Sequence, residues 1–233
     1  MIISHKYKCI FIKTNKTAGT SIEIALAKFC GKDDIITPND PKDEAIRKQL
    51  NYPGPQNYAA PFYEYRFRSL YRLIQRQKKT PQFYHHMPAA EIKALVDERI
   101  WKDYYKFCFE RNPWDRIISL YYWRYKSKPQ PPISEFITSS EPHLLNKYGY
   151  RLYTIDDNVV VDRICRFENL EEELDTVRKI LGLPDKLTLP KAKTSFRKDK
   201  RHYRDVLNEV DRENIAKMFA KEISLMNYQF EQS

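Results

Sequence analysis

The sequence twice combines a short apolar run, typical of a buried strand, with a polar turn that leads directly into a helix pattern. The first run ends at Ile12, and the helix pattern follows over 20–30. The second run, "YKFCFE" at 105–110, is followed from Pro113 by apolar residues that recur every three or four positions. Strands that alternate with helices predict an α/β fold whose central sheet is mainly parallel.

Shorter patterns complete the expected fold. They predict a first strand over 6–12, helices at 43–50 and 88–97, one or two strands within 159–167, and helices near 169–181 and 204–223. We therefore expect a P-loop-like three-layer sandwich, in which helices flank both faces of the sheet. The 233 residues fit a single domain, 1–233, better than two domains.

Charge and apolar content limit the partners and the compartment. The net charge of +10 indicates an anionic partner, but nucleic acid, a membrane surface, a phosphorylated cofactor and an acidic glycan all fit it. No apolar run approaches the roughly 18 residues that a membrane-spanning helix needs, and the first residues lack a signal-peptide core. The four cysteines form no C-x-x-C pair and are expected to be buried thiols. These features predict a cytoplasmic protein without an integral membrane segment.

The turn after the first strand predicts an anion site. Gly19 is one of only five glycines, and the helix that follows it presents N–H groups and a positive dipole end. Thr17, Thr20 and Ser21 add hydroxyl groups, and Lys16 adds a cation. In the usual nucleotide-triphosphate loop the lysine follows the last glycine, whereas Lys16 precedes Gly19. The alternative is an ordinary strand–helix connection in which Thr20 only caps the helix.

A second anion site is predicted where the second strand ends. Arg111 directly follows that strand, and ligands of α/β sheets collect at the carboxyl ends of strands. Arg116 and Ser119 lie three positions apart on the next helix and share a face, and guanidinium groups suit phosphate. The alternative for Arg111 is a structural role, in which it caps carbonyl groups at the sheet edge. Two anion sites at two strand ends predict a ligand with two separated anionic groups.

The segments "NKTAGTSI" and "ERNPWDRIISLYYW" resemble the 5′-phosphosulfate and 3′-phosphate motifs of sulfotransferases. The resemblance is closest to the Golgi carbohydrate sulfotransferases and their bacterial relatives, and it covers most of the chain. It implies transfer of a sulfuryl group from 3′-phosphoadenosine 5′-phosphosulfate to an acceptor hydroxyl, for which a carbohydrate is expected, without a metal ion. It is weakest within 31–82, which is expected to be a variable insertion that binds the acceptor.

The resemblance also assigns the cofactor-binding residues by position. They are Lys16, Thr17, Ala18, Gly19, Thr20 and Ser21 for the 5′ group, Arg111 and Ser119 for the 3′-phosphate, Arg166 and Phe167 near the adenine, and Lys193 and Arg197 in a basic stretch that closes over the nucleotide. Lys16 is placed for the oxygen between phosphate and sulfur, where negative charge grows as that bond breaks. Arg166 and Phe167 also fit a simple strand-to-helix turn. Asn15 departs from the family, because many relatives have proline there.

A histidine is expected to take the proton of the acceptor hydroxyl. His85 and His86 stand just before the helix at 88–97, where the family carries its catalytic histidine. We expect His86 to be the base, with His85 as the backup, because successive side chains of an extended segment point to opposite sides. The helix that starts downstream would also hold the imidazole neutral.

The basic and aromatic stretch 61–80 leaves two interpretations open. It is either a solvated basic helix that packs its aromatic side chains inward, or a rim where Arg66, Arg68 and Arg72 contact the acceptor. Two other function classes use the same features. A small-molecule kinase would use the phosphate loop, but the G-K-[ST] ending is missing. A nucleic-acid-binding module would use the positive charge and this stretch, although no nucleic-acid partner is expected.

Overall fold

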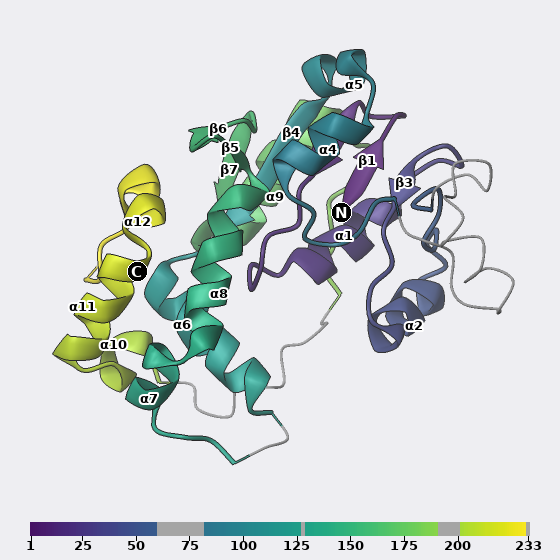
Figure 1. Cartoon of the computed structure of the whole chain (residues 1–233). Coiled ribbons are helices and arrows are strands. Elements are labelled where there is room, and N and C mark those ends of the chain that lie inside the picture. The colour runs from purple at the N-terminus through teal and green to yellow at the C-terminus, as the bar shows by residue number, and fades with distance from the viewer. Residues whose placement is uncertain (60–81, 127–128, 191–200, 232–233) are drawn as a thin grey trace, which may run out of the picture.

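A five-stranded sheet forms the centre of the molecule (Figure 1). The computed structural model describes residues 1–59, 82–126, 129–190 and 201–231. The strands, in spatial order, are β3 (Ile35–Ile36), β1 (Ile2–Ser4), β2 (Cys9–Phe11), β4 (Tyr105–Glu110) and β7 (Arg163–Arg166). β2, β4 and β7 run parallel, and β1 runs antiparallel to both β2 and β3. The mainly parallel centre confirms the predicted fold class.

The first strand differs from the expectation of one strand over 6–12. The chain instead forms an antiparallel pair, β1 and β2, around a turn in which Lys8 takes a φ of 48°. Asp34 stabilises this turn, because its carboxylate accepts hydrogen bonds from the backbone N–H of His5 at 2.6 Å and from the hydroxyl of Ser4 at 2.9 Å. The partner is about thirty residues away, so the local pattern does not reveal it.

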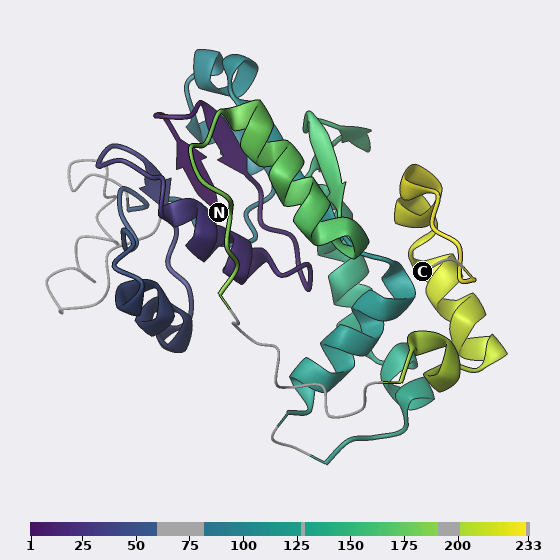
Figure 2. The ribbon, with the colours of Figure 1, turned by 180° about the vertical axis from the view of Figure 1, so that it is seen from behind.

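Two helical layers cover the two faces of the sheet (Figures 1 and 2). The covering helices are α1 (Gly19–Ala27) and α9 (Leu170–Leu181) on one face, and α4 (Ala89–Leu95) and α5 (Glu98–Asp103) on the other. Side chains of β4 alternate between these layers, as strand geometry requires. Phe107 and Phe109 pack in one cluster with Val177 of α9, and Cys108 packs in the other with Ile92 of α4. This is the predicted three-layer sandwich.

A further group of helices packs around α6 (Pro113–Arg124), beside the sheet (Figure 1). It consists of α7 (Ile133–Thr138), α8 (Ser140–Gly149), α10 (Tyr203–Val206), α11 (Glu209–Met218) and α12 (Ala220–Met226). The helix predicted at 204–223 is therefore broken, because Asn208 and Asp211 form a capping box that starts α11. The smaller elements are α2 (Pro41–Gln49), the hairpin β5 (Thr154–Ile155) and β6 (Asn158–Val159), and the 3₁₀ turns η2 (Tyr150–Leu152) and η3 (Phe167–Asn169). In the described ranges, no helix combines the length and the apolar character needed to cross a membrane.

The carboxyl ends of the three parallel strands meet at one edge of the sheet. β2 leads into residues 13–18, which we call the Lys16 loop, β4 leads into Arg111, and β7 leads into Phe167. Two hydrogen bonds attach the loop to β4. The N–H of Ile12 donates to the carbonyl of Phe107 at 2.9 Å, and the hydroxyl of Thr14 donates to the carbonyl of Phe109. The two segments that carry the sequence motifs are therefore neighbours in space.

Candidate active site

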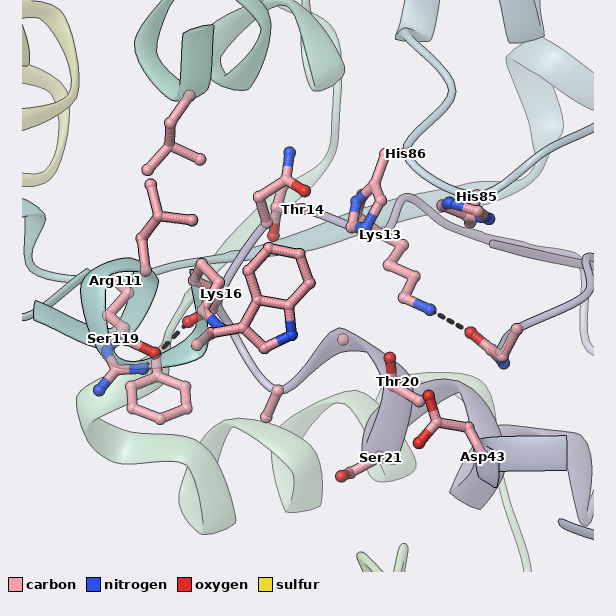
Figure 3. Close-up of a pocket in the computed structure, with 18 of the residues that line it drawn as sticks. Lys13, Thr14, Lys16, Thr20, Ser21, Asp43, His85, His86, Arg111 and Ser119 are labelled. Atoms are coloured by element: carbon pink, nitrogen blue, oxygen red, sulfur yellow. Dashed lines mark hydrogen bonds between the residues drawn. The ribbon is translucent and has the colours of Figure 1, made fainter. Parts of the chain in front are cut away.

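A pocket of about 610 Å³ lies at this edge of the sheet (Figure 3). Its walls come from the Lys16 loop with the start of α1, the residues around the start of α2, the turn before α4, Arg111 with the second half of α6, Leu145 of α8, and η3. The predicted site residues that line it are Lys16, Ala18, Gly19, Thr20, Ser21, His85, His86, Arg111, Ser119 and Phe167. Several segments that are distant in the sequence thus meet around one cavity.

The backbone of the Lys16 loop has the geometry of an anion-binding nest. Lys16 and Ala18 have left-handed φ values of 66° and 58°, and Thr17 between them does not. Such alternation turns successive N–H groups toward one concave side. Ala18 is also the N-cap of α1, where no described side chain caps the first turn. Thr20 therefore does not cap the helix, and that interpretation of the sequence is wrong.

Two arginines hold the loop by its carbonyl groups. Nη1 of Arg111 donates to the carbonyl of Lys16, and Nε of Arg116 donates to the carbonyl of Asn15, both at 3.0 Å. In a trans peptide the N–H points opposite to the C=O of the same unit. The N–H groups of Lys16 and Thr17 therefore point away from the two arginines, and their direction is fixed.

The two lysines of the motif have different surroundings. Lys13 is buried, and its ammonium group donates to Glu23 at 2.9 Å and to Asn39. Nζ of Lys16 lies 5.1 Å from the centre of the Trp123 ring, which also lines the pocket. The charge of Lys13 is therefore paired with a buried carboxylate, whereas the ammonium group of Lys16 lies against an aromatic ring of the pocket.

Gly19 is required by close packing against Lys13. A Cβ at this position would lie 2.8 Å from Cγ of Lys13 and 3.3 Å from the carbonyl oxygen of Thr14. Both atoms belong to the start of the Lys16 loop. Any larger residue at position 19 would therefore move the loop itself.

Arg111 combines a structural contact with a place in the pocket. Its Nε and Nη2 donate to Asp115 at 2.8 and 2.6 Å, and its guanidinium carbon lies 4.1 Å from the centre of the Phe167 ring. Its bond to the carbonyl of Lys16 confirms the carbonyl-capping interpretation. Figure 3 shows Ser119 on the same side of the pocket, so the pair that was predicted for an anion shares one wall.

His86 is held in one orientation and kept neutral. Its Nδ1 lies 2.8 Å from the carbonyl oxygen of Lys13. A carbonyl can only accept, so Nδ1 carries the proton and the lone pair remains on Nε2. Burial, followed by the positive charge of Lys13, lowers the pKa of His86 to about 3.

The sequence argument that preferred His86 over His85 assumed an extended segment, and this assumption is wrong. His85 and His86 occupy a turn, and His86 has a φ of 57°, so the segment is not extended. Both side chains line the pocket. Burial, rather than the start of α4, is the main cause of the lowered pKa of His86. The features that distinguish His86 are its bond to Lys13 and its lower exposure, since His85 is exposed.

Some predicted residues are not brought into the pocket. Thr17 is buried, and its hydroxyl lies 2.8 Å from that of Thr14, so its side chain is part of the loop's own structure. Arg166 donates to the carbonyl of Met226 and stacks on Tyr228, because α12 and the residues after it pack there. Five other predicted residues lie outside the described residues, namely Arg66, Arg68, Arg72, Lys193 and Arg197.

The structure adds pocket residues that the sequence patterns did not reveal. Asp40 and Asp43 come from the start of α2, and Trp123 comes from the last turn of α6. The helix of Asp43 was predicted, but nothing in the sequence shows which edge of the sheet it reaches. Within the described part of the chain, no cluster of three or more His, Cys, Asp or Glu residues could hold a metal ion.

A model described as "Sulfotransferase family" matches residues 1–148, which contain the Lys16 loop, both histidines and α6. An uncharacterized protein of Archaeoglobus fulgidus is 38% identical over 104 residues, which cover 43% of this chain and 87% of that protein. No solved structure matches the chain.

Proposed function

Because the chain belongs to the sulfotransferase family, we propose that its pocket binds 3′-phosphoadenosine 5′-phosphosulfate and directs its sulfuryl group to a hydroxyl of a carbohydrate. The family generally uses this donor. The observation that carries the proposal is the meeting of the nest, Lys16, Arg111 and a neutral His86 around one cavity. Family membership sets aside the kinase and the nucleic-acid-binding interpretations.

The donor has two separated anionic groups, and the pocket offers two places for them. The nest of the Lys16 loop and the uncapped start of α1 fit the 5′ phosphosulfate, because both direct N–H groups at an anion. Arg111 and Ser119 fit the 3′-phosphate. Phe167, whose ring already packs on Arg111, gives the adenine a flat partner.

Lys16 is proposed to stabilise the leaving group. The donor supplies a sulfuryl group whose bond to the bridging phosphate oxygen breaks during transfer, so negative charge grows on that oxygen. Lys16 and the N–H groups of its loop are fixed charges and dipoles beside that place, and such groups act most strongly where water is excluded. The ammonium group of Lys16 lies over the ring of Trp123, which lines the pocket, whereas that of Lys13 donates to the buried Glu23.

His86 is proposed to take the acceptor proton at Nε2. The carbonyl of Lys13 holds Nδ1–H, so it fixes the ring and stabilises the imidazolium that forms. With a pKa of about 3, His86 is a weak base in the ligand-free protein. It gains basicity when negative charge enters the pocket, because a nearby opposite charge favours the protonated ring. Proton removal is thereby linked to a filled donor site.

The acceptor class and the compartment complete the proposal. A carbohydrate is proposed from the resemblance to carbohydrate sulfotransferases, and Trp123 and Tyr122 give this pocket aromatic surface at the far end of α6. Transfer is proposed to need no metal ion. The cytoplasm is proposed as the place of action, in agreement with four cysteines that form no disulfide.

The proposal is tested by a transfer screen with the ³⁵S-labelled donor. Pools of glycans, lipids and small alcohols are incubated with the protein, and labelled products are separated and counted. Label on a glycan hydroxyl supports the full proposal, and label only on a lipid or small alcohol contradicts the carbohydrate class. A protein that neither binds the donor nor transfers label to any pool contradicts the assigned pocket.

A further inference from the structure

Arg116 lies behind the pocket and connects its parts, although it does not line the cavity. Its side chain is fully buried, and Nη1 donates to Glu110, also fully buried, at 2.6 Å. Nε donates to the carbonyl of Asn15 in the Lys16 loop at 3.0 Å. One guanidinium group thus connects α6, the end of β4 and the loop.

Glu110 extends this connection to the second anion site. It is the last residue of β4, and its carboxylate also accepts the backbone N–H of Arg111 at 3.0 Å and the hydroxyl of Tyr153 at 2.9 Å. The carboxylate therefore fixes the chain where Arg111 enters the pocket. The same carboxylate also holds Arg116, and Arg116 in turn holds the Lys16 loop.

Gly149 makes room for this arrangement. It ends α8 with a φ of −63°, so no left-handed conformation explains the glycine. A Cβ there would lie 3.1 Å from Nη2 of Arg116, and the guanidinium group would have to move by a few tenths of an ångström. Glycine is a poor helix former, so its presence here is explained by the space that Arg116 needs.

We propose that Arg116 is a positioning residue, which holds the Lys16 loop in its anion-binding shape and in fixed relation to Arg111. Its bond to Asn15 turns a loop carbonyl away from the pocket, and the N–H of Lys16 is directed the opposite way. Its bond to Glu110 places this anchor on the strand that also delivers Arg111. The proposal rests on the proposed function for the identity of the ligand, but the anchoring of the loop does not depend on it.

The decisive variant is Arg116→Lys. Lysine keeps a positive charge for Glu110, so the buried carboxylate is not left unpaired, but it lacks the planar fork that reaches two acceptors. Arg124→Lys is the matched control, because Arg124 lies on the same helix in an exposed ion pair with Glu141. Gly149→Ala is a second variant, which disturbs the same guanidinium group without removing it.

The first measurement uses ligand-free protein and the rate of trypsin cleavage after Lys16. Arg116→Lys is expected to raise this rate about tenfold or more over Arg124→Lys, since loss of a charge-assisted hydrogen bond lets the loop open locally. Gly149→Ala is expected to change it in the same direction by less. Equal cleavage rates in Arg116→Lys and Arg124→Lys would overturn the anchoring.

The second measurement is calorimetric binding of adenosine 3′,5′-bisphosphate and of adenosine 3′-monophosphate. Arg116→Lys is expected to weaken binding of the bisphosphate about tenfold to a hundredfold, and binding of the 3′-monophosphate less than about threefold, because only a 5′-phosphate contacts the loop. Equal loss for both ligands would assign Arg116 a general structural role and overturn the proposal. If wild-type protein binds neither nucleotide, the proposed function fails, and the cleavage rate alone decides about the anchor.

Discussion

Glu222 allows a quantitative prediction about stability and pH. Its side chain is fully buried in α12, and neither carboxylate oxygen accepts a hydrogen bond from another described residue. Burial, together with the negative charge of Glu110, raises the pKa of Glu222 from 4.5 to about 7. In the folded protein it therefore keeps its proton over a range in which the unfolded chain has released it.

The sign and size of the effect follow from this difference. Between pH 4.5 and 7 the folded state binds more protons than the unfolded state, so the free energy of unfolding falls as pH rises. The full stability is present below the pKa of Glu222 in the unfolded chain, 4.5, and the loss is complete above its pKa in the folded protein, about 7. At about 1.4 kcal/mol for each pH unit, ionisation of Glu222 costs about 3 kcal/mol in total.

The test is urea unfolding of wild type and Glu222→Gln at pH 5, 6, 7 and 8. Glutamine has the same shape and no charge to lose, so the variant should gain about 2–3 kcal/mol relative to wild type between pH 5 and pH 8. Glu213→Gln, on the exposed side of α11, is the control and should show no such trend. Parallel pH profiles of wild type and Glu222→Gln would refute the reasoning.

Three predictions concern the pocket itself. Lys16→Ala should lower turnover about 10²–10³-fold, with the affinity for adenosine 3′,5′-bisphosphate reduced less than about tenfold; activity within a few-fold of wild type would remove Lys16 from the mechanism. In calorimetry, Ser119→Ala should weaken binding of adenosine 3′,5′-bisphosphate about tenfold and binding of 5′-AMP hardly at all, since only the bisphosphate carries a 3′-phosphate. Arg111→Ala should weaken binding of both nucleotides, because Arg111 also holds the loop. His86→Ala should lower the rate about 10²–10⁴-fold with nucleotide binding intact, and His85→Ala should stay within about tenfold; the reverse order would move the role of base to His85.

Local patterns in the sequence predicted the elements that carry the site. The strand–loop–helix units around Lys16 and Arg111 are continuous segments, and the parallel pairing of β2 with β4 brings their ends together. The turn between β1 and β2 was missed because it is stabilised by Asp34, which comes later in the chain. Helix α12 was merged into a longer helix, so its contact with Arg166 was not foreseen.

The roles of individual charged residues depend on partners that no local pattern shows. The family motif singled out Lys16, but no local pattern shows that Lys13 donates to Glu23 on α1 and to Asn39. Arg116 lies on what the sequence presents as a polar helix face, yet Glu110 and Asn15 surround it in the interior. The turn at His86 has a positive φ that its sequence does not announce.

The central claim is that this pocket recognises a nucleotide with anionic groups at both its 3′ and 5′ positions. The most direct measurement is calorimetric titration of wild-type protein with adenosine 3′,5′-bisphosphate and with adenosine 5′-diphosphate, which carry two phosphates in different places. The account predicts at least about tenfold tighter binding of the 3′,5′-bisphosphate, because only this ligand reaches both the Lys16 loop and Arg111 with Ser119. Equal affinities, or a preference for the diphosphate, would contradict it.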